Sequence, residues 1–154
     1  MMYKALLVDD EALTREAVKE NIRWEEAGFE LIAACENGRD AVEVIKAEAP
    51  DLVLTDICMP YVDGLELAEY VCDNCPDTRT VIISGYDEFE YAKKAVKYRV
   101  MEYILKPVTP SELTEVLLKV KESLDEERLA YQQAVPSHPF SKRASAGGSG
   151  STEA

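Results

Sequence analysis

The chain has 154 residues, of which 47% are hydrophobic and 31% are charged, and its formal net charge is −13. This length and composition suit one globular domain with a tail. The acidic excess disfavours direct binding to nucleic acid or to an anionic membrane. No apolar run is long enough to span a bilayer, and the first residues, MMYKALLVDD, lack the cleavage site of a signal peptide, so we expect a cytoplasmic protein.

Short apolar runs alternate with amphipathic segments along the chain, which is typical of βα units and a parallel sheet. The first helix is expected to turn Leu13, Ala17 and Ile22 inward, and Asp63 is a good N-cap for the third. Thr109 to Glu112 has the pattern of a capping box. In chain order, the expected elements are strand 4–8, helix 12–24, strand 29–35, helix 40–49, strand 52–55, helix 65–72, strand 80–84, helix 88–98, strand 103–105 and a helix from 110.

These elements predict an α/β fold: a flavodoxin-like, doubly wound (βα)5 domain with a parallel sheet of order 2-1-3-4-5. In that order the first and third strands flank the switch point, where ligands bind at the carboxyl ends of the strands. We expect the domain to occupy residues 1–130. Residues 131–154 are rich in Pro, Ser, Gly and Ala, and we expect a flexible tail, either a linker or a remnant of cloning.

Polar side chains follow four of the five expected strands. Asp9 and Asp10 end the first, Asp56 the third, Ser84 the fourth and Lys106 the fifth. Each alone fits an ordinary turn, cap or surface role, but their joint placement at one sheet edge favours function. Crowded carboxylates need a counterion, and Mg²⁺ prefers oxygen ligands. A carboxylate can also attack phosphorus, with the ammonium and the hydroxyl stabilising the transferred group.

The cysteines and the single histidine favour no other chemistry. Cys72 and Cys75 form a C-x-x-C at the expected C-terminal end of a helix, beside Asp73, where a thiolate is disfavoured. A structural zinc site would need two more ligands, so we expect free thiols. His138 lies in the tail, which argues against a Ser-His-Asp triad and against a phosphohistidine in this domain.

Four motifs resemble the receiver domain of bacterial two-component response regulators, over about residues 3–125. They are VDDE at 8–11, TDICMPYVDGLEL at 55–67, ISGYDEFEYAKKA at 83–95 and YILKPV at 103–108. The segments NIRWEEAGFE and SGYDEFEYAKKA resemble in particular the YesN/AraC-type subgroup, whose output is a helix-turn-helix domain. No such segment follows residue 130. DNA binding is therefore expected only through an output domain missing from this chain; alternatively, the chain is a stand-alone receiver that acts through protein–protein contacts.

The resemblance implies a role for each residue of the expected site. Asp56 would be the phosphoacceptor, and Asp9, Asp10 and Asp56 would hold Mg²⁺ together with the backbone carbonyl of Cys58. Cys58 stands where this subgroup commonly has Arg, which is expected to alter phosphate access or lifetime but not ligation by the carbonyl. Lys106 would contact the phosphate.

The resemblance also implies a switch and its partners. Ser84 would be the switch hydroxyl and Tyr103 the switch aromatic, and the Lys106–Pro107 peptide would be cis. The donor would be a phosphohistidine on a sensor histidine kinase, and the domain would catalyse only its own phosphorylation and slow autodephosphorylation. We expect phosphorylation to reshape the face of helix 88–98, strand 103–105 and the last helix, and to promote a homodimer through Glu90, Tyr91, Lys94, Tyr98 and Arg99 near Tyr103.

Two other functions fit the residues less well. A haloacid dehalogenase-type phosphatase also uses Asp, Mg²⁺ and Lys, but it needs a second Asp two residues after the nucleophile, where Cys58 stands. A flavodoxin-like mononucleotide binder needs a loop rich in Ser, Thr or Gly after the first strand. Here that position holds Asp9, Asp10 and Glu11, which repel an anion unless a cation intervenes.

Overall fold

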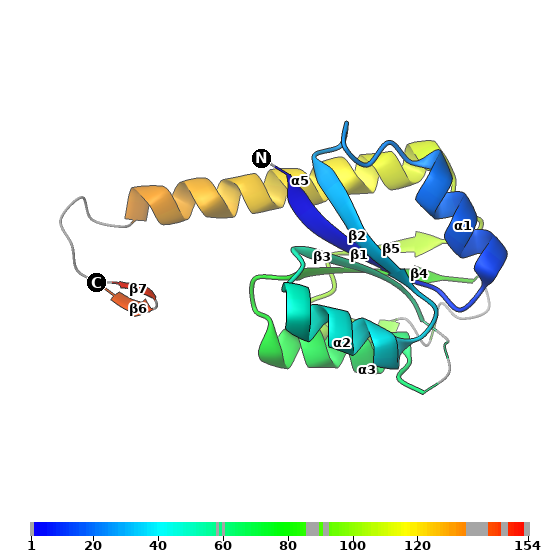
Figure 1. Cartoon of the computed structure of the whole chain (residues 1–154), viewed down its shortest axis with the longest axis horizontal. Coiled ribbons are helices and arrows are strands. Elements are labelled where there is room, and N and C mark those ends of the chain that lie inside the picture. Colours follow the sequence, from blue (N-terminus) through cyan, green and yellow to red (C-terminus); the bar gives the residue numbers. More distant parts are fainter. Residues whose placement is uncertain are drawn as a thin grey trace. The chain divides into compact units, whose positions relative to one another are not determined.

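The computed structural model describes residues 2–57, 59, 61–85, 90, 93–134, 142–145 and 148–152. Its centre is a five-stranded parallel sheet with the order β2-β1-β3-β4-β5, as predicted (Figure 1). Each strand begins and ends within one residue of its expected bounds. The strands are β1 (Tyr3–Val8), β2 (Phe29–Cys35), β3 (Leu52–Asp56), β4 (Arg79–Ser84) and β5 (Glu102–Leu105).

The register of the strands aligns their carboxyl ends. Val8 of β1 pairs with Thr55 of β3, so the next residues on the two strands are Asp9 and Asp56. On the other side of β3, β4 pairs in turn with β5, where Ser84 lies opposite Leu105. Because parallel strands present their carboxyl ends at one edge, this register collects the polar side chains there.

Four α-helices and one 3₁₀ helix accompany the sheet in the described part of the chain. Figure 1 shows α2 and α3 on one face of the sheet and α1 on the other. Within the expected helix 88–98, residues 88, 89, 91 and 92 lie outside the described residues, and the described end is a 3₁₀ helix. The helices are α1 (Ala12–Asn21), α2 (Gly38–Glu48), α3 (Gly64–Asn74), η2 (Lys93–Tyr98, 3₁₀) and α5 (Pro110–Ala134).

The helix caps follow the expected chemistry. The Asp63 carboxylate accepts the backbone N–H of Glu66 and the Glu66 side chain accepts the N–H of Asp63, which is a complete capping box at the start of α3. The Asn37 side chain accepts the N–H of Asp40 at the start of α2. At α5, the Thr109 hydroxyl accepts the N–H of Glu112 at 3.2 Å.

The inward face expected for the first helix was wrong. Leu13 is 86% exposed, and Ala17 is exposed as well, whereas Val18 is the buried residue of α1. Ile22 is buried, but it follows the helix in extended backbone (φ −102°, ψ 136°). The prediction ran the helix to residue 24 and placed Ile22 on its 3.6-residue period; because the helix ends at Asn21, that period does not apply.

The core lies on both faces of β1, β3 and β4, whose side chains are almost entirely buried. One cluster joins Leu6, Val53 and Leu67 between the sheet and the α2 and α3 helices. Strands buried on both faces read as continuous apolar runs, which is why they were recognisable in the sequence. No helix in the described part of the chain is long and apolar enough to cross a membrane.

The chain forms two compact units, residues 1–120 and 121–154. The second unit contains the end of α5 and a two-stranded antiparallel sheet, β6 (Lys142–Ser145) and β7 (Gly148–Thr152). Helix α5 continues to Ala134, past the expected boundary at residue 130. The flexibility of residues 131–154 stays a prediction.

Candidate functional site

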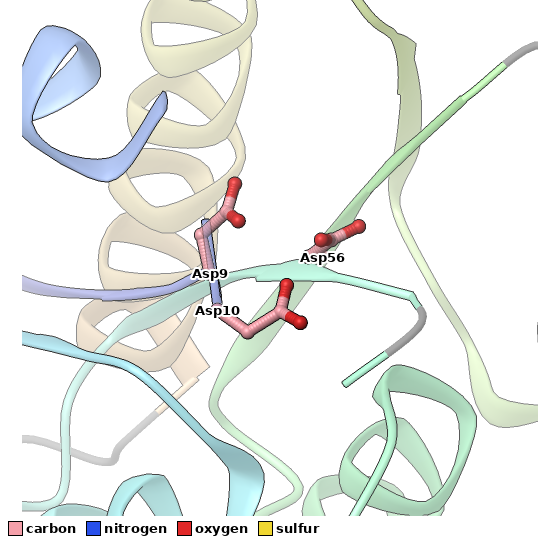
Figure 2. Close-up of side chains that lie close together, drawn as sticks. All are labelled: Asp9, Asp10 and Asp56. Carbon is pink, nitrogen blue, oxygen red and sulfur yellow. The ribbon is translucent and has the colours of Figure 1, made fainter. Parts of the chain in front are cut away.

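Three carboxylates meet at the carboxyl ends of β1 and β3. One oxygen from each of Asp9, Asp10 and Asp56 lies within 4.8 Å of the others, and Figure 2 shows the three side chains grouped at this edge. Asp9 and Asp56 are buried, whereas Asp10 is exposed. An arrangement of hard oxygen ligands with one side open to solvent is typical of a site for a divalent cation.

Lys106 brings a positive charge to this cluster from β5, two strands away from β3. Its Nζ lies 3.1 Å from Asp56 Oδ2, 3.8 Å from Asp9 Oδ2 and 3.8 Å from Glu11 Oε1. The Lys106 N–H donates to the carbonyl of Ser84 at 2.8 Å, and the Lys106–Pro107 peptide is cis. The backbone bond to β4 fixes where the lysine leaves the sheet, so its side chain reaches back toward β3.

Backbone donors orient the two buried carboxylates. Asp9 Oδ1 accepts the N–H of Glu11 at 2.9 Å, and Asp56 Oδ1 accepts the N–H of Ile57 at 2.8 Å. With these oxygens held by the backbone, the Oδ2 atom of each carboxylate faces Lys106. The Arg15 guanidinium donates to the carbonyl of Asp9 at 2.8 Å, which fixes the end of β1 against α1.

The pKa values of the site reflect its crowding. Burial, together with the neighbouring Asp9 carboxylate, raises the pKa of Asp56 to about 7 and outweighs the opposing effect of Lys106. Burial also raises the pKa of Asp9. Burial works against the ammonium of Lys106, but the nearby carboxylates of Asp9 and Asp56 prevail and raise its pKa. The lysine therefore stays charged while the carboxylates compete for protons, and a cation would relieve that competition.

Two residues of this site were missed by sequence reasoning. Glu11 extends the acidic cluster toward solvent, and the Thr14 hydroxyl donates to it at 2.6 Å and, with Lys106, lowers its pKa. The Arg15 guanidinium contacts the main-chain carbonyl of Asp9. Glu11 directly follows the paired aspartates, so its position was a usable signal. Nothing in the sequence separates Arg15 from other arginines on a helix surface, because its contact depends on how α1 leaves β1.

The remaining predicted residues lie around this centre. Ser84 is buried at the end of β4, beside the strand that carries Asp56. Tyr103 lies on β5; burial raises its pKa, and its hydroxyl has no hydrogen-bond partner in the described part of the chain. Cys58 lies outside the described residues. Cys35, Cys72 and Cys75 are free thiols.

A groove of about 490 Å³ opens beside Lys106. It lies between α1 and the segment from Lys106 to Pro110, and exposed Leu13 forms part of its wall. The groove therefore links the charged cluster to an apolar surface on α1.

Comparison with known protein families decides what this arrangement belongs to. The family model described as the response regulator receiver domain matches residues 5–118. The chain is a response regulator receiver domain. The family predicted from the motifs is confirmed, and the receiver domain has relatives among transcriptional regulators.

Among the relatives of this receiver domain is YesN of Bacillus subtilis strain 168, described as an uncharacterized transcriptional regulatory protein. It is 42% identical over 124 residues, which cover 78% of this chain and 34% of YesN. The transcriptional regulatory protein HptR of Staphylococcus aureus is 35% identical over 127 residues, or 82% of this chain and 50% of HptR. The chain thus spans a third to a half of the length of these relatives.

Solved structures agree with the fold of the receiver domain. The REC domain of AraT, a response regulator from Geobacillus stearothermophilus, has a TM-score of 0.80 and 41% identity, covering 83% of this chain and 99% of that one. A two-component transcriptional regulator AraC from Clostridium phytofermentans has a TM-score of 0.76 and 34% identity, covering 82% and 98%. The predicted YesN/AraC-type subgroup is therefore confirmed.

Proposed function

We propose that Asp56 of this receiver domain accepts a phosphoryl group from a phosphohistidine on a sensor histidine kinase. The observation that carries the proposal is the placement of Asp56: buried, with Lys106 Nζ at 3.1 Å and the carboxylates of Asp9 and Asp10 beside it. In the transfer, a carboxylate oxygen forms a bond to phosphorus as the phosphorus–nitrogen bond breaks, and the leaving imidazole takes a proton from solvent.

The donor set fits Mg²⁺. Asp9, Asp10 and Asp56 would hold the ion, with the backbone carbonyl of Cys58 as a further ligand. The match is in the chemistry of the cluster: oxygen donors only, within 4.8 Å of one another, with one carboxylate open to solvent. When bound, the ion supplies positive charge that favours the ionised form of Asp56 and offsets charge on the phosphoryl oxygens.

Lys106 and Ser84 would contact the transferred group. The ammonium already lies against Asp56 Oδ2, so it needs little movement to donate to a phosphoryl oxygen. Ser84 would donate its hydroxyl from β4, and Tyr103 would follow on β5. Because the Tyr103 hydroxyl lacks a hydrogen-bond partner in the described part of the chain, moving that side chain sacrifices no such bond. The phosphoryl group then biases an equilibrium between two conformations.

The experiment is to incubate the protein with acetyl phosphate and Mg²⁺ and to locate the label by mass spectrometry. We expect one phosphoryl group on Asp56, none in Asp56→Asn, and normal labelling in Asp73→Asn, which removes an exposed carboxylate from α3. The assignment fails if wild type takes no label or if Asp56→Asn is labelled to the same yield.

The groove beside Lys106 favours a protein as the phosphoryl donor over a small molecule. A small phosphodonor needs only the charged cluster, whereas a kinase must also dock a protein surface next to it. Leu13, largely exposed on the wall of this groove, offers apolar contact area close to the site. We propose that the kinase docks along this groove.

Phosphorylation would act on an output domain and on self-association. The relatives extend well beyond the receiver, so we propose a DNA-binding output domain in the full-length protein. We also propose that phosphorylation promotes a homodimer through the face formed by η2, β5 and the first part of α5. Glu90, Lys94 and Arg99 are exposed there and Tyr98 is half-buried, while Tyr91 lies outside the described residues. Sedimentation with and without beryllofluoride tests this; a monomer under both conditions would contradict it.

A further inference from the structure

Glu11 stands at the N-cap position of α1, directly after the paired aspartates, but its side chain does not cap the helix. A cap residue usually accepts a backbone N–H of the first helical turn, and the Glu11 side chain makes no such hydrogen bond. Its Oε1 atom instead accepts the Thr14 hydroxyl at 2.6 Å and lies 3.8 Å from Lys106 Nζ. The carboxylate is therefore held next to the lysine of the site.

Glu11 is the acid on the solvent side of that lysine. Its side chain is 63% exposed, whereas the Asp56 side chain, which contacts the same ammonium, is 5% exposed. Glu11 Oε1 and Asp56 Oδ2 can be no farther apart than their two distances to Lys106 Nζ together, about 7 Å. The Glu11 charge is thus close enough to act on whatever reaches Asp56.

The groove beside Lys106 gives this charge a position on the path of a donor. Glu11, Thr14 and Lys106 all line the groove. The three aspartates that lie within 4.8 Å of one another are the proposed Mg²⁺ ligands, so a bound ion would offset their charge. Glu11 does not belong to that group, and its charge remains, balanced only in part by a lysine that two other carboxylates share.

We propose that Glu11, held in place by Thr14, selects the phosphoryl donor by its charge. The inference rests on the proposed function, since it concerns the donor to Asp56. The Glu11 carboxylate repels an anionic donor and draws on the positive charge that Lys106 would otherwise give to the phosphoryl group, so both effects slow transfer. A donor that transfers from a protonated nitrogen, as a phosphohistidine can, carries less negative charge and is slowed less.

Two small donors separate these cases. With acetyl phosphate, an Asp56 oxygen bonds to phosphorus while the phosphorus–oxygen bond breaks, and acetate leaves with the electron pair. With phosphoramidate, the phosphorus–nitrogen bond breaks and the nitrogen, already protonated, leaves as ammonia. Near neutral pH acetyl phosphate is a dianion, and the ammonium nitrogen of phosphoramidate cancels one of its two negative charges. Glu11 should therefore slow acetyl phosphate more.

The test compares the rates at which the two donors label Asp56 in wild type and in Glu11→Gln, on the whole chain at saturating Mg²⁺. In water, a charge about 7 Å away changes a rate by roughly 3-fold for each charge on the donor. We expect Glu11→Gln to react roughly 7-fold faster with acetyl phosphate and roughly 3-fold faster with phosphoramidate at low salt. Both gains should shrink as salt is added, because the pair is exposed and salt screens it. A variant that failed to fold would lose labelling rather than gain it.

Variants of α1 provide the controls. Glu20→Gln removes the same charge from an exposed residue of the same helix, roughly 13 Å along it from Glu11, and should react as wild type does. Thr14→Ala frees the Glu11 carboxylate to move into solvent, so it should speed acetyl phosphate by less than Glu11→Gln does. In the Glu11→Gln background, Thr14→Ala should add nothing, since no charge is left to hold. Thr14→Ser keeps a hydroxyl and should restore the slower rate.

The outcomes distinguish the two proposals. Wild type that is labelled at Asp56, with Glu11→Gln no faster than Glu20→Gln, overturns only the selection of donors. An equal gain with both donors, or a gain that added salt does not reduce, also overturns it, because charge would not be the cause. Wild type that takes label from neither donor overturns the proposed function and this inference with it.

Discussion

Acidic side chains have opposite environments at the two ends of the sheet. At the amino end, the Asp51 carboxylate accepts the N–H of Lys4 at 2.8 Å, and its own N–H and carbonyl bond to Lys4 and Arg79 of the flanking strands. One acid there ties three strands together. At the carboxyl end, Asp9 and Asp56 are buried against each other, and burial raises the pKa of both.

The contrast separates polar groups that stabilise the fold from polar groups that are arranged to bind a ligand. An acid matched to backbone donors lowers the free energy of the folded state. Carboxylates gathered with fewer counter-charges raise it, and proteins keep such arrangements where a ligand compensates for them. The comparison predicts that acids removed from the two ends will change stability with opposite signs.

The largest expected effect is on the chemistry of the carboxyl end. Lys106→Met removes the ammonium 3.1 Å from Asp56 while keeping the side-chain length. Because one well-placed donor to a transferred group contributes about 100- to 1000-fold, we expect phosphorylation by acetyl phosphate to slow by roughly 100-fold or more. Lys119→Met, which removes an exposed lysine paired with Glu102, is the control and should react normally. Equal rates for the two variants would show that Lys106 has no part in transfer.

Because of Asp56, the free energy of unfolding should fall as pH rises. The folded pKa of Asp56 is about 7, above its unfolded value of 3.8. The folded state therefore binds more protons between those values, so wild type loses stability as pH rises through this range. Asp56→Asn has no such proton to lose.

We expect Asp56→Asn to be more stable than wild type by about 4 kcal/mol near pH 8 without Mg²⁺, with the difference vanishing near pH 4. Urea unfolding at several pH values measures this, and Asp73→Asn is the exposed control. A stability gain independent of pH, or a loss at every pH, would mean that the carboxylate is not destabilised as described.

At the amino end the sign should reverse. Asp51→Ala leaves the Lys4 N–H without the carboxylate acceptor that it has at 2.8 Å. An unsatisfied donor of this kind costs about 1–3 kcal/mol, so we expect a loss of roughly 2 kcal/mol in urea unfolding. Asp73→Ala is the matched exposed control. If Asp51→Ala were instead stabilising, the contrast between the two ends of the sheet would be wrong.

The fold and the site could be predicted from the sequence only where a residue's position is set by its own strand or helix. The sheet order and the meeting of Asp9, Asp10, Asp56 and Lys106 depend on strand ends, which apolar runs mark directly. The exposure of Leu13 depends on where α1 ends and how it is rotated, and that is set by tertiary packing rather than by local sequence.

Contacts that side chains make with neighbouring elements could not be predicted from the sequence, for the same reason. Arg15 on Asp9 and Arg39 on Tyr61 join residues that meet only because two elements leave the sheet in particular directions. Propensity and periodicity describe single elements, so they do not report such pairs. The left-handed backbone of Tyr61 had no signal either, because the residue there is neither Gly nor Asn.

The smallest predicted effect is the increase in stability on adding Mg²⁺. It should depend on the acids at the carboxyl end of the sheet and not on the acid at the amino end. A ligand that binds only the folded state stabilises it by about 1.4 kcal/mol at ten times its dissociation constant. Wild type and Asp51→Ala should both gain this increment, because Asp51 lies at the opposite end of β3 from the cluster. Asp10→Asn should lose it with little change in metal-free stability, since Asp10 is exposed. Thermal melts with and without Mg²⁺ measure the increment, and Ca²⁺-free buffer with a chelator gives the reference. An equal gain in stability on adding Mg²⁺ to Asp10→Asn would show that the ion binds elsewhere. Some other positive charge would then have to offset the repulsion between the acids at the carboxyl end.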